Sequence, residues 1–319
     1  MIENFQSLLL GFQTALSVGN LFLCMVGIVV GTLVGALPGI GPTGAVAILL
    51  PASYSLGPAG ALILLAGIYY GTQYGGTITS VLMRVPGESA SVVTTFDGYE
   101  MAKQGRAGVA LGIAAIGSFV GGSLSIVGLM FLGPVLANYA LAFGPAEYFA
   151  LMALALSLIT AFTGKSLVRG LIATLFGLLL GTVGDDVISG DPRLTFGTTG
   201  LLDGIQFLPV AVGLFGVSEM IESVLQKGGF EVLKSEFGFR KVLPSVADFV
   251  KSIGAMLRGT VLGFFTGILP GAGATIASFL SYGLEQRVSK TPERFGHGAI
   301  EGVAGPETVD RAQTVVAVR

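Results

Sequence analysis

Long apolar stretches separated by short polar loops recur along the whole chain. Several reach about 20 residues, which is the length of helix that crosses a hydrocarbon core of roughly 30 Å. The pattern therefore predicts an all-α fold, a polytopic membrane helical bundle. The predicted helical segments are Ile2–Val18, Asn20–Ala36, Thr43–Ala52, Pro58–Leu82, Ala107–Ala137, Glu147–Phe162, Leu167–Gly184, Gly204–Leu225, Phe249–Ile268 and Thr275–Leu284.

Two of these stretches are interrupted in the same way. Residues 27–45 read GIVVGTLVGALPGIGPTGA and residues 259–277 read GTVLGFFTGILPGAGATIA; ten of the nineteen aligned positions are identical. Pro38 and Pro270 lack an amide hydrogen, so we expect helices to end near Leu37 and Leu269. A paired break in a membrane chain indicates the binding site of a transporter.

The duplication predicts one transmembrane transporter domain over residues 1–319. Its first repeat covers about 1–225, a cytoplasmic connecting loop covers about 226–250, and an incomplete second repeat covers about 251–319. The segment 43–52 is too short to cross a membrane, because its length as a helix is about 15 Å. If it is a separate limb, the two repeats are inverted; if it continues the preceding helix, they are parallel. We favour inverted repeats.

Each break offers unpaired backbone groups to a ligand. Glycines permit the unusual backbone angles, and we expect new helices to begin near Thr43 and Thr275 as N-caps. The first amide hydrogens of a helix have no partner, and the helix dipole adds roughly half a positive charge there. Two such ends form an anion site, although each contributes at most about 2 kcal/mol.

Arg84, Lys165 and Arg169 sit at the ends of the predicted spans rather than beside the breaks, so we expect hydroxyl groups and a co-bound cation to complete the site. Residues 69–80 are rich in hydroxyls within an apolar span. Thr77, Thr79 and Ser80 are equally open to hydrogen bonds with their own helix. The predicted substrate- and ion-binding residues are Pro38, Gly39, Gly41, Thr43, Tyr74, Thr77, Thr79, Ser80, Pro270, Gly271, Gly273 and Thr275.

Glycine also recurs at every fourth position before each break, at 27, 31 and 35 and at 259, 263 and 267. We interpret these rows as helix-packing faces. Lysine and arginine concentrate in the loops at 83–106, 165–169 and 226–258, whereas the loops at 138–146 and 185–203 carry only Arg193. Because basic loops stay in the cytoplasm, we expect the first set to be cytoplasmic and the second to be outside.

Composition narrows the function classes. The chain is 52% hydrophobic and 11% charged, whereas soluble domains carry about 25% charged residues. A net charge of −2 argues against a nucleic-acid partner. We expect no enzyme, because no acid–base pair lies within the predicted spans. We also expect no metal site, because His297 has no second histidine or cysteine nearby.

Five stretches resemble the TctA family, the large membrane subunit of tripartite tricarboxylate transporters. They are GTLVGALPGIGPTGAVAILLP (Gly31–Pro51), LAGIYYGTQYGGTITSVLMRVPGESASVVTTFDGYEMAKQGRAG (Leu65–Gly108), GPAEYFALMALALSL (Gly144–Leu158), LPVAVGLFGVSEM (Leu208–Met220) and LPGAGATIASFLSYGLE (Leu269–Glu285). The resemblance implies a secondary active transporter for citrate-like tri- or dicarboxylates in the bacterial inner (plasma) membrane. It implies no cofactor but a co-transported Na⁺ or H⁺. The implied partners are a small TctB-like membrane subunit and an extracytoplasmic TctC-like solute-binding protein.

Two departures from the family pattern matter. Arg84 stands where the family implies an asparagine before the segment VPGE. The family is also considerably longer, so the resemblance implies a C-terminally truncated chain. A truncated, transport-incompetent membrane fragment of such a permease is therefore the alternative hypothesis.

Overall fold

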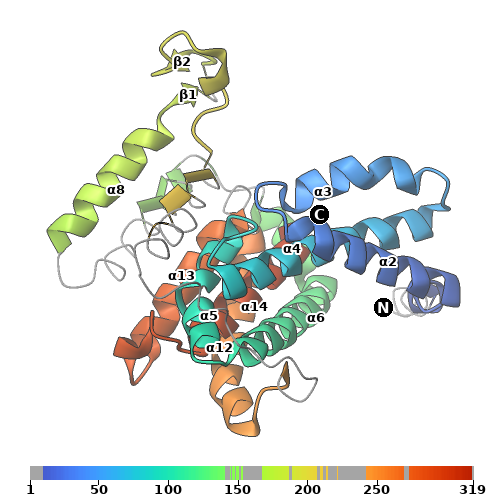
Figure 1. The fold of residues 1–319 in the computed structure, drawn as a ribbon. Helices are drawn as coiled ribbons and strands as arrows, with labels where there is room; N and C mark the ends of the chain where they lie inside the picture. The colour runs from blue at the N-terminus through green and yellow to red at the C-terminus, as the bar shows by residue number, and fades with distance from the viewer. Residues whose placement is uncertain are drawn as a thin grey trace.

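The computed structural model describes residues 10–140, 167–186, 189–206, 242–268 and 273–317, with a few single residues between 144 and 221. Almost all of its elements are helices (Figure 1), which confirms the predicted all-α fold. The described part has one antiparallel hairpin of two-residue strands, β1 (Gly184–Asp185) and β2 (Pro192–Arg193). The helices are α2 (Val18–Gly35), α3 (Gly41–Leu49), α4 (Pro58–Met83), α5 (Thr94–Lys103), α6 (Ala107–Ala140), α8 (Leu167–Gly181), α12 (Val246–Ile268), α13 (Gly273–Val288) and α14 (Glu301–Ala317), with 3₁₀ turns η1 (Leu50–Ser53), η2 (Ala90–Val92), η4 (Thr199–Leu201) and η6 (Pro292–Arg294).

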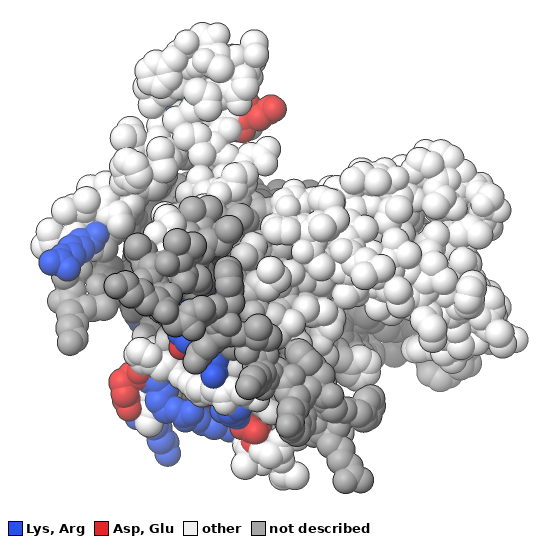
Figure 2. Space-filling view, viewed as in Figure 1, with Lys and Arg blue, Asp and Glu red and all other residues white. Residues whose placement is uncertain are grey.

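Within the part of the chain that the structure describes, two helices are long and apolar enough to cross a membrane: α2, and α6 over residues 107–132. Their most apolar windows have mean hydropathies of 2.1 and 1.9, yet only 17% of each window is buried. The core helix of a water-soluble protein would be mostly buried, whereas these helices turn apolar side chains outward, as lipid-facing helices do. Figure 2 shows the same contrast, because the surface over α2, α3 and α4 is free of charge while charged side chains gather at the bottom of the view.

The glycine rows are helix-packing faces, as predicted. A Cβ atom on Gly27, Gly31 or Gly35 of α2 would overlap a carbonyl oxygen of α4. The second row, on α12, meets α14 in the same manner, at carbonyl oxygens that are again four residues apart. The carbonyls belong to Leu64, Ile68 and Thr72 on α4, and to Gly305, Val309 and Gln313 on α14. Helix α14 therefore takes the same place against α12 that α4 takes against α2.

The first break has the predicted location. Helix α2 ends at Gly35, and the loop after it contains Pro38 and Gly39, the latter with φ of 103°. Helix α3 then turns back and lies beside α4 rather than continuing α2 (Figure 1), so the segment 43–52 is a separate limb.

The predicted N-caps are wrong. Helix α3 begins at Gly41, so Thr43 is its third residue, and Ile40 at the cap offers no side-chain hydrogen bond. Likewise α13 begins at Gly273, two residues before Thr275. Gly41 and Gly273 both have positive φ, 65° and 55°, which glycine adopts without strain. Glycine geometry, rather than a hydroxyl cap, starts each helix.

The second break is described only at its edges. Helix α12 ends at Ile268, close to the predicted end at Leu269. Pro270 and Gly271 lie outside the described residues, as does most of the predicted connecting loop at 226–250.

Two helices, α5 and α14, were not predicted from the hydrophobic pattern. Helix α14 contains Pro306 and several charged residues, yet nearly all of it is buried. It lies in the middle of the described helices, in contact with α5, α6, α12 and α13 (Figure 1). Its apolar residues join the main core, which includes Val81, Met101, Ile113, Met256, Val303 and Ala304.

Asp97 on α5 anchors the segment that leads into α14. Its Oδ1 accepts hydrogen bonds of 2.8–2.9 Å from the backbone N–H groups of Gly296, Gly298 and Ala299. Its Oδ2 accepts a hydrogen bond of 2.8 Å from the Tyr282 hydroxyl on α13. A single buried carboxylate therefore fixes where α14 begins.

The backbone at Arg84 favours the asparagine that the family resemblance implies at this position. Arg84 caps the C-terminus of α4 in the left-handed region, with φ of 56°. Asparagine and glycine adopt this conformation more readily than arginine, so the asparagine implied by the family resemblance fits the backbone better. The arginine side chain lies 5.6 Å from the centre of the Tyr99 ring.

Candidate functional site

Eight polar side chains are buried together where α4 faces α14. They come from α4, the loop after it, α5 and α14, and none is more than 9% exposed. We call this group the polar cluster; it consists of Gln73, Thr77, Glu88, Thr94, Glu307, Asp310, Arg311 and Thr314. Buried charges in a membrane protein are costly and mark ligand or ion pathways.

Close packing of a loop against α4 helps to bring these groups together. The loop at 85–91 lies against α4, since a Cβ on Gly87 would overlap Gly76 and also approach the Gly35 carbonyl oxygen at the end of α2. Farther along the loop, Ser89 accepts a hydrogen bond of 2.9 Å from Thr275 near the start of α13. The loop that carries Glu88 therefore touches the end of α2 beside the first break and the start of α13 beside the second.

Both carboxylate oxygens of Glu307 have a hydroxyl partner. The Thr77 hydroxyl lies 3.1 and 3.0 Å from its two carboxylate oxygens, and the Thr94 hydroxyl donates to Oε1 at 2.6 Å. These hydroxyls come from α4 and α5, so the Glu307 carboxylate joins three helices.

Arg311 is held by neutral groups. Its guanidinium donates to the Gln73 side-chain oxygen and, through Nε, to Ser118 on α6 at 3.2 Å. It also lies 5.7 Å from the centre of the Tyr70 ring. Among the described residues, no carboxylate is within ion-pair distance of this guanidinium. The guanidinium therefore forms no direct ion pair in the described part of the chain, although three carboxyl groups lie within its electrostatic reach.

Gln73 links α4 to two cluster residues on α14, Thr314 and Asp310. Its Nε2 donates to the Thr314 hydroxyl at 3.1 Å and lies 3.5 Å from Asp310 Oδ2. The other oxygen, Asp310 Oδ1, is buried and has no hydrogen-bond partner in the described part of the chain. Glu88 lies within electrostatic reach of Glu307, Asp310 and Arg311. The cluster thus holds three carboxyl groups and one guanidinium.

The predicted hydroxyl residues divide into two groups. Thr77 reaches Glu307 across the helix interface. Thr79 and Ser80 instead donate to the Gly76 carbonyl of their own helix at 3.0 and 2.8 Å. Tyr74 donates to the Leu111 carbonyl on α6 at 3.1 Å, and so ties α4 to α6.

The residues of the first break are not part of the cluster. Pro38, Gly39 and Thr43 are exposed on the structure, and Gly41 is half-buried. Thr275 is brought next to the cluster only through Ser89.

The hydrophobic pattern missed the charged members of the cluster. Glu307, Asp310 and Arg311 lie buried on α14, outside every predicted span. They were missed because α14 carries too many charges for an apolar-run search to find it. A helical signal was nevertheless available, since Glu307, Asp310, Arg311 and Thr314 recur at intervals of three or four residues and share one helix face.

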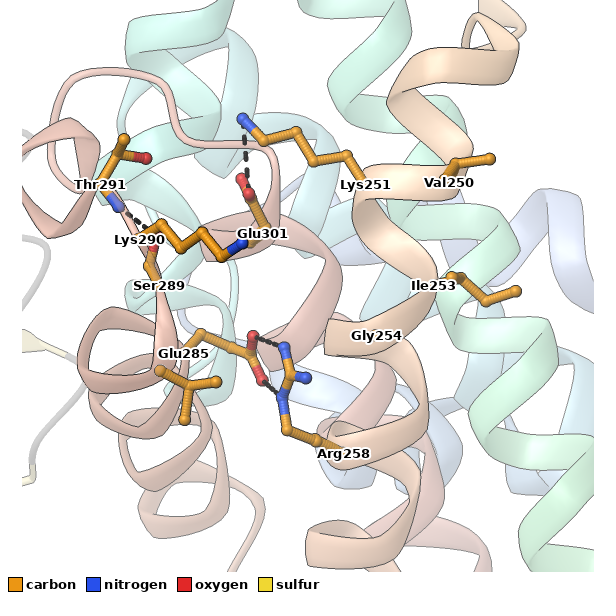
Figure 3. Close-up of a pocket in the computed structure, with 11 residues that line it drawn as sticks. Val250, Lys251, Ile253, Gly254, Arg258, Glu285, Ser289, Lys290, Thr291 and Glu301 are labelled. Carbon is orange, nitrogen blue, oxygen red and sulfur yellow. Dashed lines mark hydrogen bonds and ion pairs between the residues drawn. The ribbon is translucent and has the colours of Figure 1, made fainter.

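A separate cavity of about 460 Å³ lies between the ends of α12 and α13 (Figure 3). Arg258 and Glu285 point toward each other there and form two hydrogen bonds of 2.8 and 2.5 Å. Lys251 and Glu301 form a second ion pair of 3.4 Å. None of the predicted site residues lines this cavity, and its acids are already paired.

Taken together, outward-facing apolar helices around a buried charged cluster define an α-helical membrane protein with an internal polar site. The chain belongs to the tripartite tricarboxylate transporter TctA family, whose family model matches residues 21–318.

Two relatives from Agrobacterium vitis are similar to the chain. An uncharacterized 52.8 kDa protein in the TAR-I ttuC' 3' region is 48% identical over 315 residues, which cover 98% of the chain and 62% of the relative. An uncharacterized protein in the TAR-II ttuC' 3' region is 58% identical over 50 residues, covering 16% of the chain and 21% of the relative. The chain thus spans less than two thirds of the length of these relatives. No solved structure matches it.

Proposed function

We propose that the chain acts in a secondary active transporter that takes citrate-like tri- or dicarboxylates across the bacterial inner membrane. Uptake is coupled to Na⁺ or H⁺, and the chain belongs to a multi-pass large subunit. Its partners are a small membrane subunit and an extracytoplasmic solute-binding protein, as membership of a tripartite transporter family suggests. The observation that carries the proposal is the buried Arg311, whose described contacts are to neutral groups.

Arg311 supplies the full positive charge that helix ends alone lack. A guanidinium presents a planar fork of donors that matches a carboxylate, and the pair is strongest where water is excluded. The neutral partners Gln73 and Ser118 orient the guanidinium without neutralising its charge. We assign Arg311 to bind one carboxylate of the substrate.

The two breaks are proposed to line the route to this arginine. Their glycines open the backbone, and the helix starts at α3 and α13 direct amide hydrogens toward an anion. The loop at 85–91 touches the helix beside each break and carries Glu88, so movement at either break is transmitted to the cluster. The proposed lining residues of the breaks are Pro38, Gly39, Gly41, Thr43, Pro270, Gly271, Gly273 and Thr275.

Inverted repeats are supported by the contacts between α4 and α14. Tyr69 hydrogen-bonds to Thr314, and Thr77 to Glu307, so the two helices run antiparallel. The glycine contacts align Leu64 with Gly305, which also aligns Tyr69 with Asp310 and Gln73 with Thr314. The contact of Tyr69 with Thr314 is therefore the counterpart of the contact of Gln73 with Asp310. A two-fold axis perpendicular to both helices produces this exchange, as expected for inverted repeats.

A binding measurement tests the proposal without requiring transport. The purified chain in detergent is melted with and without citrate, and we expect citrate to raise the melting temperature because it binds the folded state. Arg311→Gln should abolish the citrate effect, since it removes the charge and keeps a polar side chain. The control is Arg193→Gln, which removes a half-exposed arginine from the β1–β2 hairpin and should leave the citrate effect intact. A full citrate effect in Arg311→Gln would remove this arginine from the site.

A further inference from the structure

Carboxylate binding by Arg311 does not explain why Asp310 is buried. The Asp310 side chain is 4% exposed, and its Oδ1 has no hydrogen-bond partner among the described residues. Its Oδ2 has only the long contact of 3.5 Å from Gln73. A buried carboxylate oxygen without a donor is strongly unfavourable unless something else satisfies it.

The surroundings of Asp310 are short of positive charge. The neighbouring Arg311 directs its hydrogen bonds to Gln73 and Ser118 instead. Two more carboxyl groups, Glu88 and Glu307, lie within electrostatic reach. The titratable and charged groups that face Asp310 from the elements around it are Glu88, Glu307, Arg311, Tyr69 and Tyr70.

We propose that Asp310, through Oδ1 and with Glu88 as its neighbour, binds the coupling cation, a small monovalent ion that is either H⁺ or Na⁺. Glu307 is a different case, because two threonine hydroxyls already satisfy it. A divalent metal fits less well, because the described residues contain no group of three metal-binding side chains. The assignment deepens the proposed transport function and rests on its cation coupling.

The geometry also suggests why cation and substrate would bind together. A substrate carboxylate on Arg311 cancels the one positive charge of the cluster, which leaves Asp310 and Glu88 with no compensating charge. Cation binding then becomes more favourable, and linkage requires the cation to favour the substrate by the same factor. Adjacent positions on α14 thus couple an anion to a cation.

The experiment measures cation binding without substrate. The purified chain is melted in Na⁺ or choline at constant ionic strength, and separately across pH 6 to 8.5 in choline. We expect a higher melting temperature either in Na⁺ or at low pH, and the arm that responds identifies the ion. Asp310→Asn, which keeps the shape and removes the charge, should abolish that response, and Glu88→Gln should weaken it.

Asp191→Asn is the matched control, because Asp191 is exposed in the β1–β2 hairpin and should respond like the unaltered chain. An unchanged response in Asp310→Asn overturns the assignment, as does a lack of response to both ions in the unaltered chain. The outcome is independent of citrate binding, so loss of carboxylate recognition and loss of the cation site are told apart. With citrate present, the cation response of the unaltered chain should strengthen, and Arg311→Gln should remove this increase.

Discussion

At the scale of single residues, hydroxyl groups decide whether a buried charge is tolerated. Glu307 and Asp310 lie one helical turn apart on the same helix, yet the first receives two hydroxyl donors and the second has an oxygen with none. We therefore assign Glu307 to the architecture of the site and Asp310 to ligand binding. Their difference is set by α4 and α5, which supply Thr77 and Thr94.

Thr94→Val should destabilise the chain by about 1–3 kcal/mol, because it leaves the Glu307 carboxylate with one donor fewer in a buried site. Thermal melting of the purified chain measures the effect. Thr79→Val is the control, since Thr79 bonds only to its own helix and its loss should cost far less. Equal effects from the two substitutions would show that Thr94 does not sustain Glu307.

At the scale of helices, small residues determine which pairs approach. The α2–α4 and α12–α14 pairs both depend on glycine rows that place one backbone against another. Where backbones touch, an added methyl group has no space, because protein interiors are packed nearly as densely as crystals.

Gly31→Ala should lower stability by about 1–3 kcal/mol, because the new Cβ overlaps the carbonyl of Ile68 and overpacking costs this much. Gly177→Ala in α8 is the matched control: nothing lies within 4 Å of its Cβ position, so the better helix propensity of alanine should leave stability unchanged or improved. A melting temperature that falls in Gly31→Ala but not in Gly177→Ala would support close backbone packing at Gly31. An unchanged melting temperature in Gly31→Ala would contradict it.

At the scale of the whole molecule, two units of three helices meet at the polar cluster. The first is α2, α3 and α4, and the second is α12, α13 and α14. In each unit two helices follow one another, and the third packs on the first through a row of glycines. The charges of α14 and the hydroxyls of α4 are therefore complementary parts of a single site.

Inverted repeats predict that α4 and α14 begin on opposite sides of the membrane. Two single-cysteine variants in a Cys24→Ser background test this orientation. Tyr54→Cys places a cysteine just before α4, and Lys290→Cys places one before α14. In intact spheroplasts, an impermeant maleimide should label position 54, while position 290 should react only after permeabilisation, because its loop is basic. Labelling of both from the same side would favour parallel repeats.

The all-α class, the first break and the packing role of the glycine rows follow from the sequence alone. These features depend on local chemistry: apolar runs, a missing amide hydrogen at Pro38, and the absence of a side chain at glycine. The sequence also pointed to Thr77, which contacts Glu307, but did not distinguish it from Thr79 and Ser80, which bond to their own helix.

Which polar groups meet depends on how the helices are arranged in the folded chain. Helix α14 was missed because a charged segment is not expected to lie inside a membrane bundle unless partners on other helices satisfy it. Those partners, Gln73, Thr77 and Thr94, are more than 200 residues away along the chain. Hydrophobic pattern is local, whereas hydrogen bonds that satisfy a buried charge depend on contacts that form only when the chain has folded.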